Sequence, residues 1–451
     1  MVFLFGFGEG ALMGQNPAEV SPTYEHLNGV DLPNVSVADL NTDDLTIAVA
    51  TDLNGYVYTL SFGNGVQKRS ADGVVVDANF ISGLDNPLDL AVDSEGFIYI
   101  ADYEAGGDFN DDGQIKIFNP EGDYVRSILT SYFRPLGVDV DEDYIYIAEY
   151  NAGETAESTP SSRIRIINKD NGSVKAENEN VEIPYRIAVD SKGNVYVSQA
   201  GGGDPAVLIF NENLVYQREL ANIQSPGSVV VDPFDYIHVV EYAGRIDFSE
   251  FINFSSLEFN DIFRIAQEIE DGIDDNAFGI KIFGPGGDFE YFFKNRIDFP
   301  IDLAFDDCSR MYVDNAYVPT FFGIPTGIEF DLEIYKRTPT FDSLEAPVIT
   351  CPASIEITAE PGNDFAEVEF ENATATDNCA VTVEQTSGDP SGSAFAVGTH
   401  TIEFTATDDF GNEDVCSFSI VVNPSEEEPT LPNFADCPSD MPNISTDPGE
   451  C

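Results

Sequence analysis

The stretch NPLDLAVDSEGFIYIADY, residues 86–103, decides the fold. A proline precedes a short apolar segment that ends in Asp93, and a D-x-x-G turn leads into an alternating segment that carries Tyr99. In such a turn the Asp side chain bonds the backbone two residues on, and Gly accepts a positive φ. The stretch therefore predicts two antiparallel strands joined by a tight turn.

The same pattern recurs along the chain at fixed spacing. Five copies start at a proline: Pro87, Pro135, Pro184, Pro226 and Pro300. The Asp that follows six residues later is Asp93, Asp141, Asp190, Asp232 or Asp306. The second strand then carries Tyr99, Tyr146, Tyr196, His238 or Tyr312. An upstream copy, TIAVATDLNGYVY (46–58), keeps the register without the proline. Such regular spacing predicts a repeat architecture.

Each unit continues with two further alternating segments, for example QIKIFNP (114–120) and DYVRSIL (123–129). Four short antiparallel strands in roughly 45 residues are typical of a propeller blade. The six units predict an all-β, six-bladed β-propeller over residues 22–341. The last unit lacks an obvious fourth strand, and residues near Tyr24–Val30 could supply it and close the ring.

The repeat resembles the NHL repeat family, with PLDLAVDSEGFIYIADY and IKIFNPEGDYV as the clearest match. The segment 346–423 resembles the HYR (hyalin repeat) module, from I-x-C-P through V-G-T and T-A-T-D to the closing C-S-F. These resemblances imply an NHL-like propeller followed by an immunoglobulin-like β-sandwich, as in secreted or cell-surface bacterial proteins. The HYR resemblance also implies a disulfide between Cys351 and Cys416.

After a linker at 424–434, residues 435–451 repeat the opening of the sandwich, since Cys437-Pro438 matches Cys351-Pro352. The chain is therefore expected to be a piece of a longer protein with more such modules. At the other end, residues 1–15 are apolar and then rich in small residues, like the remnant of a secretory signal. The alternative is a disordered or strand-forming N-terminus.

The composition excludes some partners. The chain carries 81 acidic residues against 20 Lys and Arg, a net charge of −61. Nucleic-acid binding depends on neutralising phosphates with Lys and Arg, so no nucleic-acid partner is expected. No apolar run after the N-terminus reaches the roughly 18 residues of a membrane span. Five of the six cysteines lie in the last 101 residues, which favours export and disulfides.

Polar residues end the second strand of each unit, and they could meet around one face of the channel. These are Asp102, Glu149, Gln199, Glu241 and Asn315, with Ser61 in the first unit. Together they could bind a ligand or a hard cation, which prefers oxygen ligands. In the alternative, each bonds its own loop backbone. With only three histidines in the chain, a His-held metal is not expected, and His238 is predicted to be a structural ring in the place of Tyr.

The loop GGDFNDDGQ (106–114) has the alternating oxygen ligands of a calcium loop. Asp108, Asn110, Asp112 and the carbonyl of Gln114 are the candidate ligands, and calcium is the candidate cofactor. Asn119 stands where an EF-hand has its bidentate Glu, so this is not an EF-hand. The alternative is an acidic, solvated turn.

The loops between second and third strands hold nearly all the length variation, and the repeat places them on one rim. Insertions on one face of a repeat array usually mark its binding face. The longest loop follows Tyr242 and contains SSLEFNDIFRIAQEIEDG, which predicts a capped helix that either covers the channel or contacts a ligand. We therefore expect a secreted or cell-surface adhesion protein that binds an extracellular protein or glycan through the rim, with the sandwiches as spacers. The alternative is a propeller-type lactonase or lyase with a carboxylate-held metal.

Overall fold

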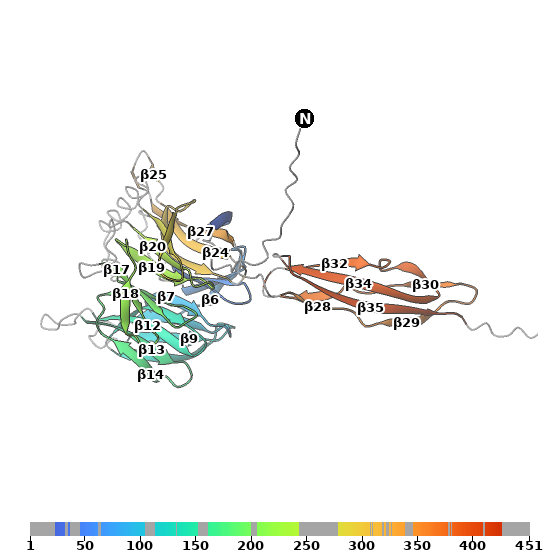
Figure 1. The fold of residues 1–451 in the computed structure, drawn as a ribbon, viewed down its shortest axis with the longest axis horizontal. Helices are drawn as coiled ribbons and strands as arrows, with labels where there is room; N and C mark the ends of the chain where they lie inside the picture. The colour runs from blue at the N-terminus through green and yellow to red at the C-terminus, as the bar shows by residue number, and fades with distance from the viewer. Residues whose placement is uncertain are drawn as a thin grey trace, which may run out of the picture. The chain divides into compact units, whose positions relative to one another are not determined.

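The computed structural model divides the chain into two units, residues 1–343 and 344–451. It describes residues 23–31, 35–36, 46–61, 65–103, 113–131, 133–151, 161–199, 205–242, 278–306, 308, 310–317, 320–321, 324–325, 327–338, 346–377, 379, 381–408 and 411–425. These residues form strands and turns only (Figure 1). Among them there is no helix long and apolar enough to cross a membrane.

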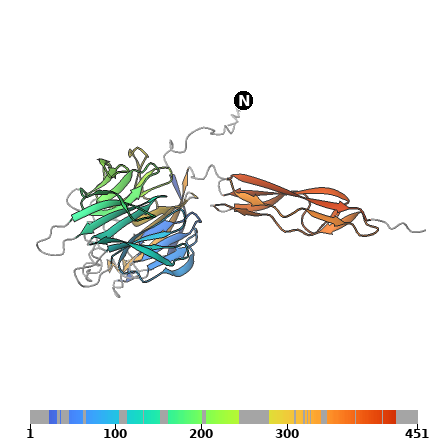
Figure 2. The same ribbon diagram turned by 90° about the horizontal axis from the view of Figure 1, so that it is seen from below.

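The first unit contains repeated four-stranded antiparallel sheets, the blades of a six-bladed β-propeller (Figure 2). Blade 1 consists of β3 (Thr46–Thr51), β4 (Val57–Ser61), β5 (Gly65–Arg69) and β6 (Val75–Ile81). Blade 2 consists of β7 (Pro87–Val92), β8 (Ile98–Tyr103), β9 (Gly113–Phe118) and β10 (Tyr124–Ser131). Blade 3 consists of β11 (Arg134–Val140), β12 (Tyr144–Asn151), β13 (Ser161–Asn168) and β14 (Val174–Asn178).

Blade 4 consists of β15 (Pro184–Val189), β16 (Val195–Gln199), β17 (Ala206–Phe210) and β18 (Tyr216–Glu219). Blade 5 consists of β19 (Pro226–Val231), β20 (Ile237–Glu241), β21 (Gly279–Phe283) and β22 (Phe289–Phe293). The first strand of every blade has a register shift directly after its proline position, for example between Pro87 and Asp89. The repeated sequence thus produces a repeated irregularity as well as repeated strands.

Blade 6 is completed from both ends of the propeller sequence. It contains β23 (Phe299–Phe305), β24 (Arg310–Tyr317) and β27 (Gly327–Thr338). The N-terminal strand β1 (Thr23–Asp31) pairs antiparallel with β27 as the outer strand, and β2 (Val35–Ser36) pairs with the start of β27. A small hairpin, β25 (Thr320–Phe321) and β26 (Ile324–Pro325), lies between β24 and β27 in the chain. The predicted closing strand near Tyr24–Val30 is confirmed.

The first strands form the inner ring of the propeller. Each packs beside the first strand of the next blade, and β23 packs beside β3. Apolar side chains fill the space between neighbouring blades, such as Ile98, Ile100, Ile145 and Ile147, all fully buried. Because a blade buries its two faces only against neighbours, the core is a set of interblade layers rather than one centre.

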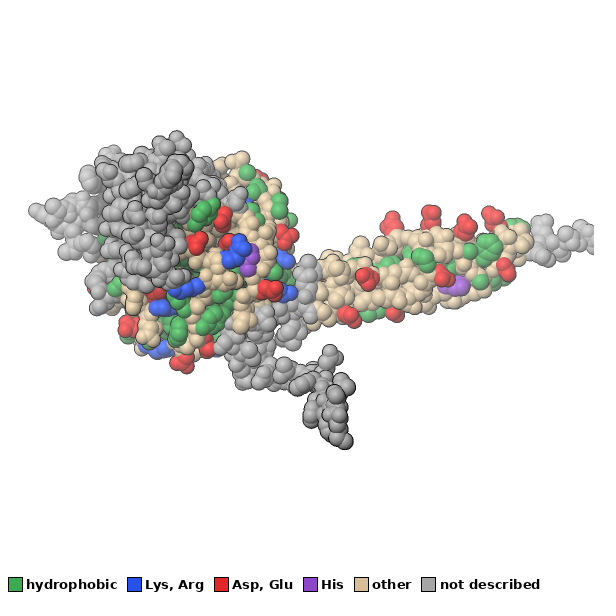
Figure 3. Space-filling view, turned by 90° about the horizontal axis from the view of Figure 1, so that it is seen from above, with side chains coloured by type: hydrophobic (Ala, Val, Ile, Leu, Met, Phe, Trp, Pro, Cys, Tyr) green, Lys and Arg blue, Asp and Glu red, His purple; other side chains and the backbone are tan. Residues whose placement is uncertain are grey.

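The second unit is a β-sandwich. One sheet has the order β29 (Ile355–Thr358), β35 (Glu413–Asn423), β34 (Gly398–Asp408) and β32 (Val381–Ser387). Against it lie the pairs β28 (Val348–Thr350) with β31 (Thr374–Thr376) and β30 (Phe365–Val368) with β33 (Ser393–Ala396). The inward residues of β34, Ile402, Phe404 and Ala406, are buried and alternate with more exposed ones. On the face of the sandwich that Figure 3 shows, the Asp and Glu side chains are scattered singly.

Candidate functional site

One aspartate per blade organises the turn between the first and second strands. In blade 1, Oδ1 of Asp52 accepts hydrogen bonds from the backbone N–H of Asn54 (3.0 Å) and Tyr56 (2.8 Å). Oδ2 accepts the Tyr58 hydroxyl at 2.9 Å. The same Tyr-to-Asp bond joins Tyr99 to Asp93, Tyr146 to Asp141, Tyr196 to Asp190, and Tyr312 to Asp306. The repeat spacing is therefore the spacing of a buried hydrogen-bonded pair.

Blade 5 departs from this pattern at the tyrosine position. His238 replaces the tyrosine and is fully buried; its Nδ1 donates to the Tyr236 carbonyl, and its Nε2 accepts the hydroxyl of Tyr24 on β1 at 2.6 Å. Burial lowers the pKa of His238 to about 3, so the ring is neutral. Asp232 instead accepts Nε of Arg337 on β27 at 3.0 Å. Strands β1 and β27 of blade 6 thus contact blade 5 through Tyr24 and Arg337. His238 has the predicted structural role.

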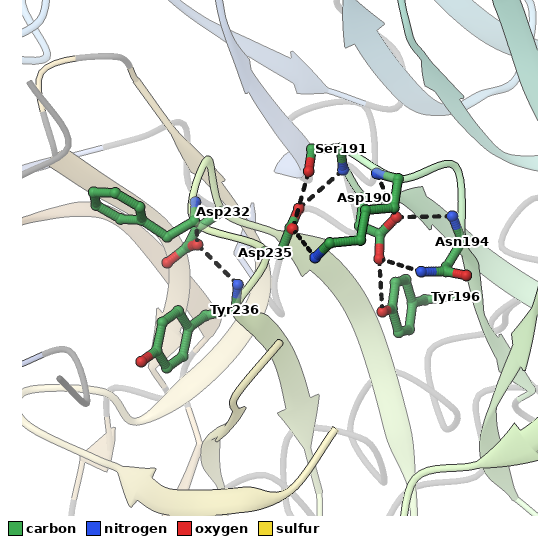
Figure 4. Close-up of polar contacts among 9 residues, drawn as sticks. Asp190, Ser191, Asn194, Tyr196, Asp232, Asp235 and Tyr236 are labelled. Atoms are coloured by element: carbon green, nitrogen blue, oxygen red, sulfur yellow. Dashed lines mark hydrogen bonds and ion pairs between the residues drawn. The ribbon is translucent and has the colours of Figure 1, made fainter. Parts of the chain in front are cut away.

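Blade 5 also carries an aspartate where the turns of blades 1, 2 and 4 have glycine. Asp235 has a φ of 63°, in the left-handed region that Gly193 occupies at 80° in blade 4. Its carboxylate accepts the backbone N–H and the hydroxyl of Ser191, both at 2.9 Å, and Nζ of Lys192 at 2.6 Å. Figure 4 shows this link between the turns of blades 4 and 5. Asp tolerates this conformation better than most residues, and its three bonds hold the two turns together.

A cavity of about 350 Å³ occupies the channel between the first strands. It extends from their middle to the D-x-x-G turns, where Asp52, Leu53, Ser191 and Asp235 line it. Most of the wall is backbone and small apolar side chains of the six first strands. The first strands contribute six polar side chains to the wall, and the turns add Asp52, Ser191, Asp232 and Asp235; the six on the strands are Thr51, Asp89, Asp139, Arg186, Ser228 and Asp302.

These channel residues bond one blade to another. Oδ2 of Asp89 accepts the N–H of Val138 in the next blade at 2.9 Å, and Oδ2 of Asp302 accepts the N–H of Val49 at 3.0 Å. The spacing of the repeat does not predict these contacts. The available signal was a charged residue at an inward position of an otherwise apolar first strand, as in PLDLAVD and PIDLAFD.

The side chain of Arg186, on β15 of blade 4, reaches across the channel to two other blades. Its guanidinium donates to the carbonyl oxygens of Leu136 and Ile47, both at 3.0 Å, which belong to blades 3 and 1. Its Nε lies 3.5 Å from Oδ1 of Asp89. The side chain is 3% exposed, and its charge serves contacts within the propeller.

The polar residues that end the second strands are buried and bonded within their own blades. Asp102 accepts the backbone N–H of Asp85 and Asn86, just before β7. The side-chain oxygen of Gln199 accepts the backbone N–H of Glu182. The Glu241 carboxylate accepts the backbone N–H groups of Gln224 and Ser225. The side-chain oxygen of Asn315 accepts the backbone N–H groups of Asp298 and Phe299. As in the structural alternative, the partners are backbone groups, but they lie at the start of the first strand and not in the loop that follows each residue. Ligand binding by these residues stays a prediction.

The carboxylates of this set also have cationic partners. Lys116 lies 2.5 Å from Asp102, Lys281 lies 3.0 Å from Glu241, and Arg163 and Arg165 both contact Glu149. Each cation comes from the third strand of the same blade. A metal ion would have to displace these neighbours before it could use the carboxylates.

The predicted calcium loop falls mostly outside the described residues. Asp108, Asn110 and Asp112 lie there, whereas Gln114 is on β9, opposite Asp102 and Leu129. The insert at 243–277 with its predicted helix, the N-terminal residues 1–22 and the segment 426–451 are outside them as well. Within the described parts of the chain, no group of three or more His, Cys, Asp or Glu side chains could hold a metal ion.

Cys351 and Cys416 form a disulfide that joins residues 65 positions apart in the sandwich. Cys308 and Cys379 are each disulfide-bonded as well. Nothing in the sequence around either cysteine indicates its partner. The described cysteines of the chain are therefore oxidised, as expected outside a reducing compartment.

Comparison with known proteins finds one family match, in the second unit, and several solved structures that are similar to part of the chain. Residues 343–422 match the HYR domain. No curated protein matches the chain.

Among solved structures, a gluconolactonase from Xanthomonas campestris is 13% identical, with a TM-score of 0.44, and the match covers 70% of this chain and 100% of that one. A virginiamycin B lyase from Staphylococcus aureus is 14% identical with a TM-score of 0.40, over 70% and 99% of the two chains. The WD40 β-propeller domain of Doa1 is 9% identical with a TM-score of 0.40, over 69% and 97%.

Proposed function

We propose that this chain is a secreted or cell-surface binding protein whose propeller recognises an extracellular protein or glycan through the rim that carries the second-to-third-strand loops. The sandwich acts as a spacer. The observation that carries the proposal is the contrast between a fixed frame and variable loops. The loops span residues 62–64, 104–112, 152–160, 200–205, 242–278 and 318–326, between strands that repeat closely.

The strand ends beneath these loops are already paired. Tyr103 is opposite Gly113, Asn151 opposite Ser161, and Glu241 opposite Gly279. The blades therefore close without the loops, which leaves loop length and sequence free to serve recognition. The HYR match and the oxidised cysteines support an extracellular setting.

A metal-dependent lactonase or lyase is the second candidate, because the similar solved structures include a gluconolactonase and a lyase. The enzyme has less support than the binding protein. The strand-end carboxylates are occupied by backbone N–H groups and by Lys or Arg side chains. A lactonase of this kind would need several of them free for a metal.

One experiment distinguishes the binding protein from the enzyme. The purified chain is applied to immobilised extracellular proteins and polysaccharides, and in parallel to lactones and polysaccharides with added Ca²⁺, Mg²⁺ or Zn²⁺. We expect saturable binding to a member of the panel and no turnover. Turnover that EDTA abolishes, without saturable binding, would favour the enzyme.

A further inference from the structure

The channel cavity contains one carboxylate that differs from its neighbours. Six aspartates line the cavity. Five contact another side chain: Asp52 with Tyr58, Asp89 with Arg186, Asp232 with Arg337, Asp235 with Lys192, and Asp302 with Ser228. Within the described residues, Asp139 accepts only the backbone N–H groups of Val140 (2.8 Å) and Val189 (2.9 Å).

Asp139 is also the cavity aspartate that keeps some exposure. The other five are buried, with exposed fractions of 7% or less, whereas Asp139 is partly exposed. The two backbone bonds fix its carboxylate in place, and the cavity that it lines is on its open side. A carboxylate held in this way is preorganised for a partner, because little side-chain entropy remains to be lost on binding.

The position of Asp139 in the repeat is occupied elsewhere by small apolar residues. Four residues after the proline position stand Ala50, Ala91, Ala188, Val230 and Ala304, and all five line the same cavity. One carboxylate therefore lies in a ring of aliphatic side chains. Burial raises the pKa of Asp139 to about 7, the behaviour of an acid that lacks a counter-charge.

We propose that the channel cavity binds a small organic cation, with its ammonium group on the Asp139 carboxylate and a short aliphatic body against the alanine and valine ring. The volume of about 350 Å³ is near the lower end of the range for ligand pockets, which suits a short ligand. The site is at the D-x-x-G turns, on the side opposite the second-to-third-strand loops, so it is independent of the proposed rim function.

Other ligand classes fit less well. A hard metal ion needs about six or more oxygen ligands, and one free carboxylate does not supply them. An anion would face the remaining cavity aspartates, and the one cation among the lining residues, Arg186, is held by Asp89 and two carbonyl oxygens. A neutral apolar molecule would cover the Asp139 carboxyl group without giving it a hydrogen-bond partner, which is unfavourable for a polar group.

The test is calorimetric titration of the full chain with n-butylammonium chloride, with 1-butanol and sodium chloride as separate probes. Three variants accompany it. Asp139→Ala introduces the residue that blades 1, 2, 4 and 6 have at this position, so the fold should tolerate it. Asp139→Asn keeps a hydrogen-bond acceptor and serves if the alanine variant does not fold. Asp143→Ala, at an exposed turn residue of the same blade, is the charge-matched control.

We expect saturable binding of butylammonium by the native chain and by the Asp143 variant, and at least tenfold weaker binding by the Asp139 variants. Butanol and sodium chloride should give no saturable heat. The proposal is overturned by equal affinity in the Asp139 variants, by butanol binding as well as butylammonium, or by no saturable binding to the native chain.

Discussion

A single aspartate at the end of each first strand holds three parts of its blade together: the turn, the start of the second strand and a buried tyrosine. The geometry is repeated with distances of 2.5–3.1 Å between Tyr hydroxyl and Asp oxygen. Where the tyrosine is replaced, at His238, the aspartate has another partner, Arg337. A carboxylate at this position is never left without a donor among the six described turns.

Removing one such hydroxyl should be costly. In Tyr58→Phe, Oδ2 of Asp52 loses its donor, and both residues are buried. We expect a loss of about 1–3 kcal/mol in the free energy of unfolding, measured by urea denaturation. Tyr216→Phe on β18, where the ring is exposed, should change it by little. Equal effects of the two substitutions would contradict the structural role of the pair.

Asp314 on β24 is an acid in an apolar position. It is fully buried, neither carboxyl oxygen has a hydrogen-bond partner in the described structure, and Asp302 is directly opposite on β23. Burial, with the charge of Asp302 as a second cause, raises the pKa of Asp314 well above its usual range, while Arg69 lowers it. Its protonated form is therefore the one that favours folding.

The sign of the pH effect follows. Stability from protonated Asp314 is complete below the unfolded pKa of about 4 and is lost as pH rises toward the folded pKa, by about 1.4 kcal/mol per pH unit. Asp314→Asn removes this loss, so its melting temperature relative to the native chain should increase from pH 5 to pH 8. Asp143→Asn should show no such trend. A pH-independent difference for Asp314→Asn would contradict the assignment.

At the scale of strands, the closure of the ring depends on β1. It pairs along β27, and Tyr24 packs against Phe293 and Phe305 while its hydroxyl reaches His238 in blade 5. The strand thus links blade 6 to blade 5 by a side chain as well as completing a sheet. Blade 5 departs from the repeat at His238, which bonds Tyr24 of β1, and at Asp232, which accepts Arg337 of β27 in place of a tyrosine.

A chain that begins after residue 31 should therefore melt at a lower temperature than the native chain. A synthetic peptide of residues 22–33 should restore part of the loss in a concentration-dependent way, because it binds only the folded propeller. A peptide of the same composition in scrambled order is the control. An unchanged melt after removal of β1 would show that the ring does not depend on it.

The disulfide should stabilise the sandwich without affecting the stability of the propeller. Replacing both Cys351 and Cys416 with Ser opens a loop of 65 positions and should destabilise the sandwich by about 4 kcal/mol on the chain-entropy model. In calorimetry the sandwich transition should shift to lower temperature and the propeller transition should stay. A shift of the propeller transition instead would contradict this assignment.

At the scale of the whole molecule, a net charge of −61 makes the folded state repel itself. Salt should raise the melting temperature, mostly within a few tenths molar, where the Debye length falls well below about 10 Å. Calcium should raise it further at equal ionic strength if residues 108–114 bind it, since a ligand specific to the native state adds about 2.7 kcal/mol at a hundredfold excess over Kd.

The variant with Asp108→Asn and Asp112→Asn should lose the calcium-specific increment and keep the salt effect. Differential scanning fluorimetry in matched CaCl2 and NaCl series measures both. If this variant keeps the whole calcium increment, the loop is an acidic turn.

The sequence predicted the frame better than the site. The recurring proline, Asp and aromatic ring at fixed spacing were enough to predict six blades, because five of the described blades bury the same Asp–Tyr pair and blade 5 keeps a ring, His238, at that position. The channel acids Asp89, Asp139 and Asp302 were missed, since each breaks the apolar pattern singly and their partners lie in other blades. The partners of Asp102 and Glu241 were likewise hidden, because they depend on which backbone N–H groups the closed blade brings near.

We propose that the rim loops recognise the partner and that the frame determines the fold. One variant tests both parts by replacing residues 104–112, 152–160 and 243–277 with short Gly–Ser linkers, which the paired strand ends beneath them allow. Melting and binding to the partner found in the panel are measured on the same sample. We predict a cooperative melt close to the native one and loss of binding. Retained binding with an intact fold would contradict the account.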